Sequence, residues 1–300
     1  MKGISINSTT IFIWVCMLPV LLFLIVVAVA PTTVAIIDSL KNLSLTSHMA
    51  RGQFVGLSNF RKLIGSDPKF YTALWHTALF VVLVVPIEFV AGLTLALALN
   101  RDFNGKRLVL TVVMIPTVIA PVVVSLVWLL LLVPTFGVLT QLMNTVGLFR
   151  ETGVFSDPTT AFGALVLIDI WEWTPFIMLI MLAGLSAMPQ APIEAASLDG
   201  ATRWQILMHV QLPLLRPLII IALLLRTIDA SKVFDTIYVL TGGGPGDSTE
   251  VLSTFAFRTN FMNWNLGYGA AVCLLIAFAS LVIAAAFYKI VTITQARAGT

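Results

Sequence analysis

The sequence predicts an all-α integral membrane protein with six transmembrane helices, and two observations carry this prediction. Charge is scarce: 59% of the 300 residues are hydrophobic and only 31 are charged, 17 Lys and Arg with 14 Asp and Glu, where a soluble chain would carry about 75. Charge is also clustered, because residues 3–37, 108–149 and 259–288 are uncharged runs of 35, 42 and 30 residues. Apolar runs beyond roughly 18 residues are candidate membrane spans, so soluble enzyme folds are excluded.

Six segments are long and apolar enough to cross a bilayer core, which requires about 20 residues per helix. They lie at about residues 11–37, 74–99, 108–132, 162–185, 214–240 and 266–290. Turn residues separate the segments, and together they form a single transmembrane domain that covers residues 1–300.

The first segment also has features of a secretory signal peptide. Lys2 precedes the apolar run, and residues 28–30, Ala-Val-Ala, resemble a cleavage site. Pro31 directly after that site is unfavourable for cleavage, and the apolar run is longer than a signal-peptide core. We therefore expect this segment to remain as the first span.

The uncharged run after Arg107 is long enough to suggest a seventh span. Residues 134–137, Pro-Thr-Phe-Gly, interrupt it, and the 12 residues left before Arg150 are too few to cross a bilayer. A helix lying on the membrane surface is the better use of that stretch.

Orientation is predicted from the basic residues of short loops, which are enriched on the cytoplasmic side. With a cytoplasmic amino terminus, eight basic residues lie inside and seven outside, and five of those seven lie in the loop between the first two spans. Without that loop the count is eight to two, which favours both termini inside. The sequence offers no explanation for the five basic residues of the loop, which are Lys41, Arg51, Arg61, Lys62 and Lys69.

Residue types that bind metals or phosphates are scattered along the chain. Cys16 and Cys273 fall inside predicted spans, and the three histidines have no ligand spacing. The glycine-rich run at residues 242–246 lacks the Lys and Ser or Thr of a phosphate loop. We therefore expect no metal, nucleotide or other cofactor in this chain.

The segment between the fourth and fifth spans, residues 189–213, predicts two short helices at an angle. Gly200 can take the left-handed conformation that ends a helix. Thr202 and Gln205 have the spacing of a capping box, and Pro213 predicts a break before the fifth span. Such an elbow would project from the membrane surface, either as a linker or to dock a soluble partner.

The residue spacing of this elbow resembles the EAA loop of membrane subunits of ATP-binding-cassette importers. The motif here consists of Glu194-Ala195-Ala196, Gly200, Val210 and Leu212-Pro213. In this family the elbow sits in a groove on the ATPase subunit and transmits its movement. The resemblance therefore implies an ATPase-coupling role for Glu194, Ala195, Ala196, Asp199, Gly200, Ala201 and Trp204.

Four further segments narrow the resemblance to the carbohydrate-uptake branch, the relatives of maltose-transporter permeases. These segments are residues 54–60, 155–158, 226–230 and 240–245. The resemblance implies the type I importer permease fold, with six helices and both termini cytoplasmic, in the bacterial inner membrane. It also implies a second permease subunit in a heterodimer, two ATPase subunits that bind ATP and Mg, and a solute-binding protein.

Seven ionisable residues lie at predicted membrane depth, where charges are costly and are commonly functional. They are Glu88 in the second span, Asp169 and Glu172 in the fourth, and Arg226, Asp229, Lys232 and Asp235 in the fifth. A spacing of three residues puts the members of each set on one helix face, so the two faces can meet. We expect Glu88 to be an interhelical partner and Lys232 and Asp235 to pair structurally.

The resemblance favours a substrate role for the other buried charges. Maltose-type permeases hold the sugar mid-membrane between a turn of the fourth core helix around a proline and a facing turn of the fifth, which match residues 169–176 and 226–230 here. Carboxylates and guanidinium groups bond hydroxyls, and aromatic rings cover the apolar side of a sugar. The implied substrate-binding residues are Asp169, Glu172, Trp173, Phe176, Arg226 and Asp229, whereas Trp171 is expected to pack against helices.

These features predict the transmembrane subunit of an ATP-driven importer, and not an enzyme. It would take a sugar or polyol from a periplasmic or extracellular binding protein into the cytoplasm by alternating access. The acid-rich lining favours a neutral ligand, although Arg226 leaves sugar acids open.

Two other functions stay open at this point. An ion-coupled secondary transporter could use the same charges as a relay, although no inverted repeat is clear. An intramembrane enzyme could use Asp169 and Glu172 as paired acids, although no catalytic motif accompanies them.

Overall fold

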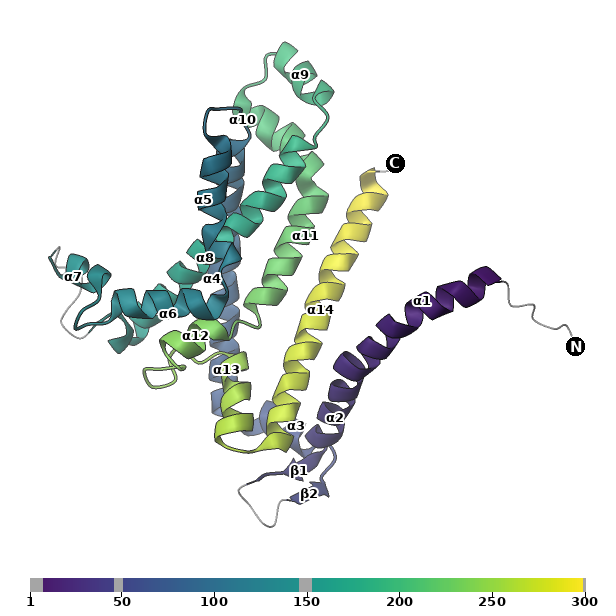
Figure 1. Cartoon of the computed structure of the whole chain (residues 1–300), viewed down its shortest axis with the longest axis vertical. Helices are drawn as coiled ribbons and strands as arrows, with labels where there is room; N and C mark the ends of the chain where they lie inside the picture. Colours follow the sequence, from purple (N-terminus) through teal and green to yellow (C-terminus); the bar gives the residue numbers. More distant parts are fainter. Residues whose placement is uncertain (1–7, 46–50, 146–152, 299–300) are drawn as a thin grey trace, which may run out of the picture. The chain divides into compact units, whose positions relative to one another are not determined.

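The computed structural model describes residues 8–45, 51–145 and 153–298 (Figure 1). The chain divides into two compact units. The first comprises the chain up to Asp67 together with Ala256–Leu275, and the second comprises Pro68–Phe255 and the chain from Ile276 onward.

The first unit begins with one long apolar helix. It consists of α1 (Ser8–Leu24), a π-helical turn (Ile25–Val29) and α2 (Ala30–Ser39). The π turn lies directly before Pro31, whose missing N–H removes an α-helical hydrogen bond. The apolar side chains in the membrane-spanning part of this helix are exposed within the chain.

A small hairpin follows the first helix. Strands β1 (Lys41–Leu43) and β2 (Arg51–Phe54) are antiparallel, and α3 (Ser58–Ser66) comes next. The Asn59 side-chain amide donates to the carbonyl oxygens of Ser39 at 2.7 Å and Lys41 at 2.9 Å, which fixes α3 against the hairpin. The start of α14 (Leu266–Ala298) approaches so closely that a Cβ on Gly267 would lie 2.2 Å from the Lys41 carbonyl oxygen.

The basic residues of the first loop, unexplained by the sequence, have local partners in three of five cases. The Lys41 ammonium lies 3.5 Å from the Asp38 carboxylate. The Lys62 ammonium lies 5.4 Å from the centre of the Tyr268 ring, a cation–π contact. Lys69, which belongs to the second unit, lies 3.4 Å from Asp247 of that unit. These contacts give three of the basic side chains local partners but leave their charges in place, so they do not alter the topology count.

The second unit is helical throughout its described residues. Its elements are α4 (Pro68–Leu99), α5 (Lys106–Val118), α6 (Pro121–Leu132), α7 (Val138–Thr145), a 3₁₀ turn (Val154–Ser156), α8 (Pro158–Ser186), α9 (Ala191–Leu198), α10 (Arg203–Ile206), a π turn (Leu207–Gln211), α11 (Leu212–Ala230), α12 (Asp235–Leu240) and α13 (Leu252–Phe257). A further π turn (Arg258–Met262) and α14 follow, with α14 extending through both units.

The core of the second unit lies between α4 and α8. Phe80 and Leu165 are fully buried in one apolar cluster, and Ile177 and Met178 in another. A Cβ added to Gly92 of α4 would lie 2.8 Å from the Ile177 side chain, so a glycine lets the two helices approach closely. This packing fixes the faces of α4 and α8 that carry charge.

Five helices in the described chain are long and apolar enough to cross a membrane, and they match five of the six expected spans. They are Phe12–Ser39, Pro68–Leu99, Pro158–Ser186, Arg203–Leu240 and Leu266–Ile290. The prediction of an all-α membrane protein is therefore confirmed.

The third span differs from the prediction. One helix was expected over residues 108–132, but α5 and α6 are bent by 94° at the break between them. Ile119 and Ala120 are extended, and Pro121 starts α6. For Ala120 the reason is that a residue directly before proline is disfavoured in the helical conformation. The described residues hold up to six candidate spans when this bent pair is counted as one. The following helix, α7, has 8 residues and is too short to cross.

Candidate substrate site and coupling elbow

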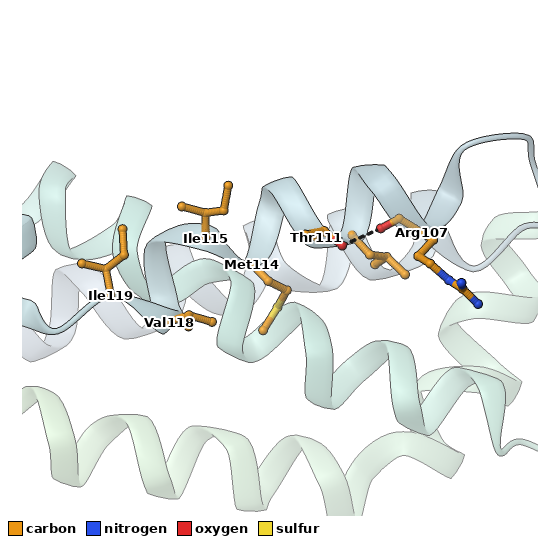
Figure 2. Close-up of a pocket in the computed structure, with 7 residues that line it drawn as sticks. Arg107, Thr111, Met114, Ile115, Val118 and Ile119 are labelled. Carbon is orange, nitrogen blue, oxygen red and sulfur yellow. Dashed lines mark hydrogen bonds between the residues drawn. The ribbon is translucent and has the colours of Figure 1, made fainter.

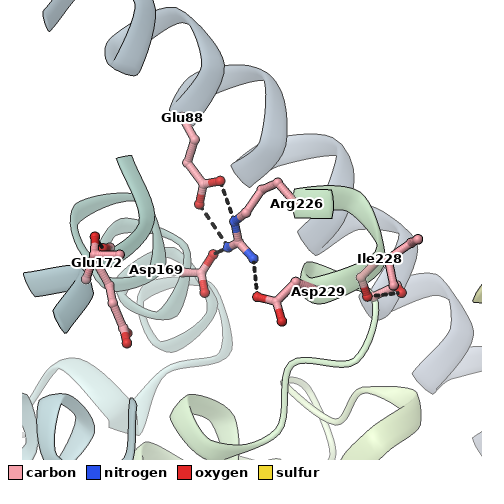
Figure 3. Close-up of polar contacts among 8 residues, drawn as sticks. Glu88, Asp169, Glu172, Arg226, Ile228 and Asp229 are labelled. Carbon is pink, nitrogen blue, oxygen red and sulfur yellow. Dashed lines mark hydrogen bonds and ion pairs between the residues drawn. The ribbon is translucent and has the colours of Figure 1, made fainter. Parts of the chain in front are cut away.

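A buried arginine joins three helices of the second unit (Figure 3). Arg226 of α11 is 1% exposed. Its Nε and Nη2 donate to the two carboxylate oxygens of Glu88 on α4, at 2.6 and 2.9 Å. Nη2 also donates to Asp169 on α8, and Nη1 donates to Asp229 on α11 at 3.0 Å. We call these four residues the Arg226 cluster.

The chemistry of the guanidinium group explains why carboxylates surround Arg226. A lone buried cation would be strongly destabilising, whereas the planar guanidinium can donate to several carboxylates at once. Glu88 is the interhelical partner that the sequence analysis expected. Three carboxylates for one guanidinium leave acid in excess, so the cluster favours a ligand that donates hydrogen bonds over one that carries negative charge.

The members of the cluster differ in access. Arg226 and Asp169 are fully buried, and their polar atoms bond each other. The Asp229 side chain is 52% exposed, so it keeps a face open. In this conformation Asp229 is the cluster member that a ligand can reach, and the substrate roles of Asp169 and Arg226 stay predictions.

The two predicted aromatic residues lie beside this cluster. The Arg226 guanidinium carbon lies 5.1 Å from the centre of the Trp173 ring, which is cation–π geometry. Phe176 meets Trp173 edge to face with 6.1 Å between ring centres. The structure thus brings an aromatic pair and the charged cluster together.

Glu172 is the predicted site residue that stands apart. It is 1% exposed, and its Oε2 has no hydrogen-bond partner among the described residues. Figure 3 shows its carboxylate directed away from Arg226. Its backbone carbonyl accepts a hydrogen bond from the Thr117 hydroxyl at 2.6 Å, which ties α8 to α5 close to the bend.

A polar cavity of about 120 Å³ opens beside the cluster. Its lining includes Asp169, Trp173, Arg226 and Asp229, together with residues for which the sequence analysis expected only structural roles or none: Pro121, Lys232, Val233, Phe234, Asp235 and Thr236. Ligand pockets usually enclose about 300–1,000 Å³. In this single chain the cavity is smaller than that range.

The residues that sequence reasoning missed come from a second break. The fifth span was expected as one helix over residues 214–240, but α11 ends at Ala230 and α12 begins at Asp235. The unwound backbone between them brings Lys232 and Phe234 to the cavity. No proline or glycine marks this break. The available signal was the four charged residues from Arg226 to Asp235, because charged side chains destabilise a continuous apolar helix in a membrane.

Trp171 has the packing role that we expected. Its ring meets Trp128 of α6 edge to face, with 5.5 Å between ring centres. This contact lies on a different side of α8 from the Arg226 cluster, because Asp169 and Trp173 turn the other way into the cavity.

The elbow folds largely as the sequence predicts. After α9, Gly200 takes a left-handed conformation with φ of +80°. The Thr202 hydroxyl accepts from the Gln205 N–H at 3.3 Å, and the Gln205 side-chain oxygen accepts from the Thr202 N–H at 2.8 Å. This is the expected capping box, and it starts α10.

The expected break at Pro213 is wrong. The helix runs from α10 through the π turn into α11, and Arg203–Leu240 forms one apolar segment. In the π turn the Leu212 N–H bonds the carbonyl of Leu207 five residues back, so the hydrogen-bond register shifts just before the proline. Pro213 follows directly, so its missing N–H falls where the α-helical hydrogen bonds are already interrupted.

The surface of the elbow is suited to docking. No residue of α9, which carries Glu194, Ala195 and Ala196, is buried. Leu198 is 88% exposed and Trp204 is 64% exposed. Large apolar side chains exposed on a projecting segment mark an interaction site.

A groove along α5 has a different character (Figure 2). It encloses about 520 Å³ and is lined by Arg107, Leu110, Thr111, Met114, Ile115, Val118 and Ile119. The Thr111 hydroxyl donates to the Arg107 carbonyl at 2.9 Å, so this hydroxyl is already bonded. The groove is almost wholly apolar, which makes it unsuitable for a polyhydroxylated ligand.

Comparison with known proteins decides the family. Residues 88–294 match the model of the binding-protein-dependent transport system inner membrane components. The chain belongs to this family. It is 39% identical over 223 residues to the trehalose/maltose transport system permease protein MalF of Thermococcus litoralis, covering 74% of each chain. It is 38% identical over 237 residues to the trehalose transport system permease protein SugA of Mycobacterium tuberculosis, covering 79% of this chain and 75% of SugA.

The fold of this permease has a solved counterpart. A chain of a bacterial importer of the acidic polysaccharide alginate has a TM-score of 0.82 over 95% of this chain and 96% of that one, at 23% identity. The predicted type I importer permease fold is confirmed. The permease is thus a transport subunit, and the two other functions, a secondary transporter and an intramembrane enzyme, are set aside.

Proposed function

We propose that this permease forms part of the membrane path for a neutral sugar or polyol in a bacterial inner membrane. The observation that carries the proposal is the acid-rich cavity beside the Arg226 cluster, which is flanked by an aromatic pair. Carboxylates accept hydrogen bonds from vicinal hydroxyls, and ring faces cover C–H surfaces. The names of the relatives, which transport trehalose or maltose, support the same substrate class.

The roles within the site follow from access. Asp229 accepts hydrogen bonds from the sugar, and Trp173 and Phe176 cover an apolar ring face. Glu88, Asp169 and Arg226 hold the three helices in register and orient Asp229. Glu172 has an unbonded buried oxygen and becomes available when α8 moves during the transport cycle.

The proposed assembly contains a second permease, two ATPase subunits and a solute-binding protein. A cavity of about 120 Å³ in one chain supports a site completed by the second permease, which we propose to be a different chain. ATP and Mg²⁺ bind to the ATPases. The elbow residues Glu194, Ala195, Ala196, Asp199, Gly200, Ala201 and Trp204 dock into an ATPase groove. They transmit its closure to α11, because α10 of the elbow continues through the π turn into that helix.

The experiment that tests this function begins with the cognate solute-binding protein. It is screened by calorimetry against neutral disaccharides, polyols, sugar acids, peptides and amino acids. Ligands that bind are then tested for ATP-dependent uptake into vesicles containing the complete importer. We expect a neutral sugar or polyol to bind and to be transported. Binding of peptides or amino acids alone would contradict the proposal.

A further inference from the structure

A second cleft lies where α4 ends against the elbow. It encloses about 740 Å³ between the end of α4 and the α9–α10 turn. Its lining includes Arg101, which follows α4, and Arg203 and Trp204 from α10. We call it the Arg101–Arg203 cleft. All of its residues belong to the second unit.

The two arginines of this cleft lack ion-pair partners among the described residues. Within the part of the chain that the structure describes, no carboxylate lies within ion-pair distance of Arg101 or Arg203, whereas the neighbouring Asp102 pairs with Lys106 at 3.5 Å. Both arginines are exposed. Two guanidinium groups that line one cleft without counter-ions suit a phosphate group, because the planar fork of each can bind it in a pair of hydrogen bonds.

The rest of the lining matches the boundary of a membrane. Leu97 and Leu207 contribute apolar surface, and Leu97 lies in the last turn of a membrane-spanning helix. The cleft therefore offers hydrocarbon contacts on one side and cationic contacts on the other.

We propose that the Arg101–Arg203 cleft binds an anionic phospholipid, independently of the sugar path. The headgroup phosphate accepts hydrogen bonds from Arg101 and Arg203, and an acyl chain lies against Leu97 and Leu207. A lipid is favoured over an acidic patch of the ATPase because the cleft is bounded by the end of a membrane helix. Ile193 and Ser197 of α9 line the cleft, but the proposed coupling residues of α9, Glu194, Ala195 and Ala196, are not among its lining residues. Basic pockets at helix ends commonly bind lipid headgroups.

A lipid in this cleft would contact a part of the chain that we propose to move during transport. Arg203 and Trp204 lie on α10, in the elbow that we propose to move with the ATPase. A lipid bound there joins α4 to the elbow. Occupancy would therefore stiffen the joint between the two and change the rate of ATP-driven uptake.

The test measures lipid retained by the complete importer, purified from nanodiscs of phosphatidylcholine with and without phosphatidylglycerol and examined by native mass spectrometry. The variants are Arg101→Gln, Arg203→Gln and both together. Arg107→Gln is the matched control, because Arg107 is a nearby basic residue that lines the α5 groove instead. Arg101→Lys keeps the charge and separates charge loss from misfolding.

We expect retention of phosphatidylglycerol to fall about fivefold for each arginine removed, as one basic side chain near an anionic membrane surface predicts, with no change for Arg107→Gln and a smaller loss for Arg101→Lys. Equal retention in the wild type and the double variant would overturn the proposal. So would loss of the ATPase subunits with unchanged lipid retention, which would make the cleft an ATPase contact. Displacement of the lipid by inorganic phosphate alone would overturn the lipid as occupant.

Discussion

Two sets of arginines in this permease are handled in opposite ways. Arg226 is buried among three helices and bonded to three carboxylates, whereas Arg101 and Arg203 are exposed in a cleft at the elbow without an ion pair among the described residues. At membrane depth a cation persists only with counter-ions already in place. At a helix end, water can solvate it until a partner arrives. The first arrangement holds the helices together, and the second is available for binding.

The largest effect is expected at the elbow, where the conformation of one residue controls coupling. Gly200 has a φ of +80°, which proline cannot adopt because its ring fixes φ near −65°. Gly200→Pro should abolish ATP-driven uptake while the protein still inserts, measured by vesicle uptake and by immunoblot of membranes. Glu194→Lys should do the same, because it reverses a charge on the exposed face of α9.

Gly200→Ala is the matched control for this prediction. Nothing lies within 4 Å of a Cβ added at Gly200, so alanine meets only the backbone cost of about 1–2 kcal/mol. Uptake should fall only in part. Normal uptake by both Gly200→Pro and Glu194→Lys would remove the coupling role of the elbow.

The next largest effect is on stability, through the Arg226 cluster. Arg226→Leu leaves Glu88, Asp169 and Asp229 without their cation, and the free energy of unfolding should fall by about 3–5 kcal/mol. Thermal unfolding of the detergent-solubilised protein measures this. Replacing both partners, in Glu88→Leu with Arg226→Leu, should restore part of the loss because one buried charge is removed with its partner. A double variant less stable than Arg226→Leu alone would contradict this account of the cluster.

A smaller and more selective effect is expected at Asp229, where a substitution should change uptake more than stability. Its side chain is 52% exposed, so Asp229→Asn should change stability by about 1 kcal/mol or less. If Asp229 bonds the sugar, the substrate concentration for half-maximal uptake should rise about tenfold. Asp38→Asn is the control, because this partly exposed carboxylate also forms an ion pair, with Lys41, and is not among the residues that line the cavity. Unchanged uptake by Asp229→Asn would restrict Asp229 to a structural role.

The smallest effect is expected in the basic loop. Lys62 makes an exposed cation–π contact with Tyr268, so Lys62→Gln should lower the free energy of unfolding by only about 0.5–1 kcal/mol and leave uptake unchanged. A loss as large as that of Arg226→Leu would contradict the comparison, because an exposed basic side chain would then contribute as much to stability as the buried arginine.

Much of the fold follows from the sequence because its signals are local. Uncharged runs marked the spans, Gly200 marked the turn of the elbow, and Thr202 with Gln205 marked its capping box. Such features depend on residues close together in the chain, so spacing reveals them.

The errors concern places where hydrogen-bond register or long-range packing decides. Pro121 ended a helix, whereas Pro213 did not, because a π turn shifted the register just before it. The break after Ala230 carries no proline or glycine. The sequence therefore could not place Lys232 and Asp235 at the cavity.

The sequence predicted most of the residues of the candidate site, but not which of them bond one another and which point elsewhere. Spacing put Asp169 and Arg226 on facing helices, and the structure joins them. Arg226 donates hydrogen bonds to three carboxylates, and Glu172 points elsewhere. Both arrangements depend on how α4 packs against α8. Helix packing of this kind is not encoded in residue spacing along one helix.

The central claim is that the cavity beside the Arg226 cluster lies on the sugar path, and protection of a cavity residue tests it most directly. In a chain with Cys16 and Cys273 replaced by serine, Lys232→Cys places a thiol in the cavity lining, and Asp102→Cys places one on the exposed loop after α4 as a control. The rate of thiol labelling is measured in the complete importer with binding protein and Mg-ATP. The account predicts that the transported sugar slows labelling at position 232 and not at position 102. Equal labelling at position 232 with and without the sugar would contradict it.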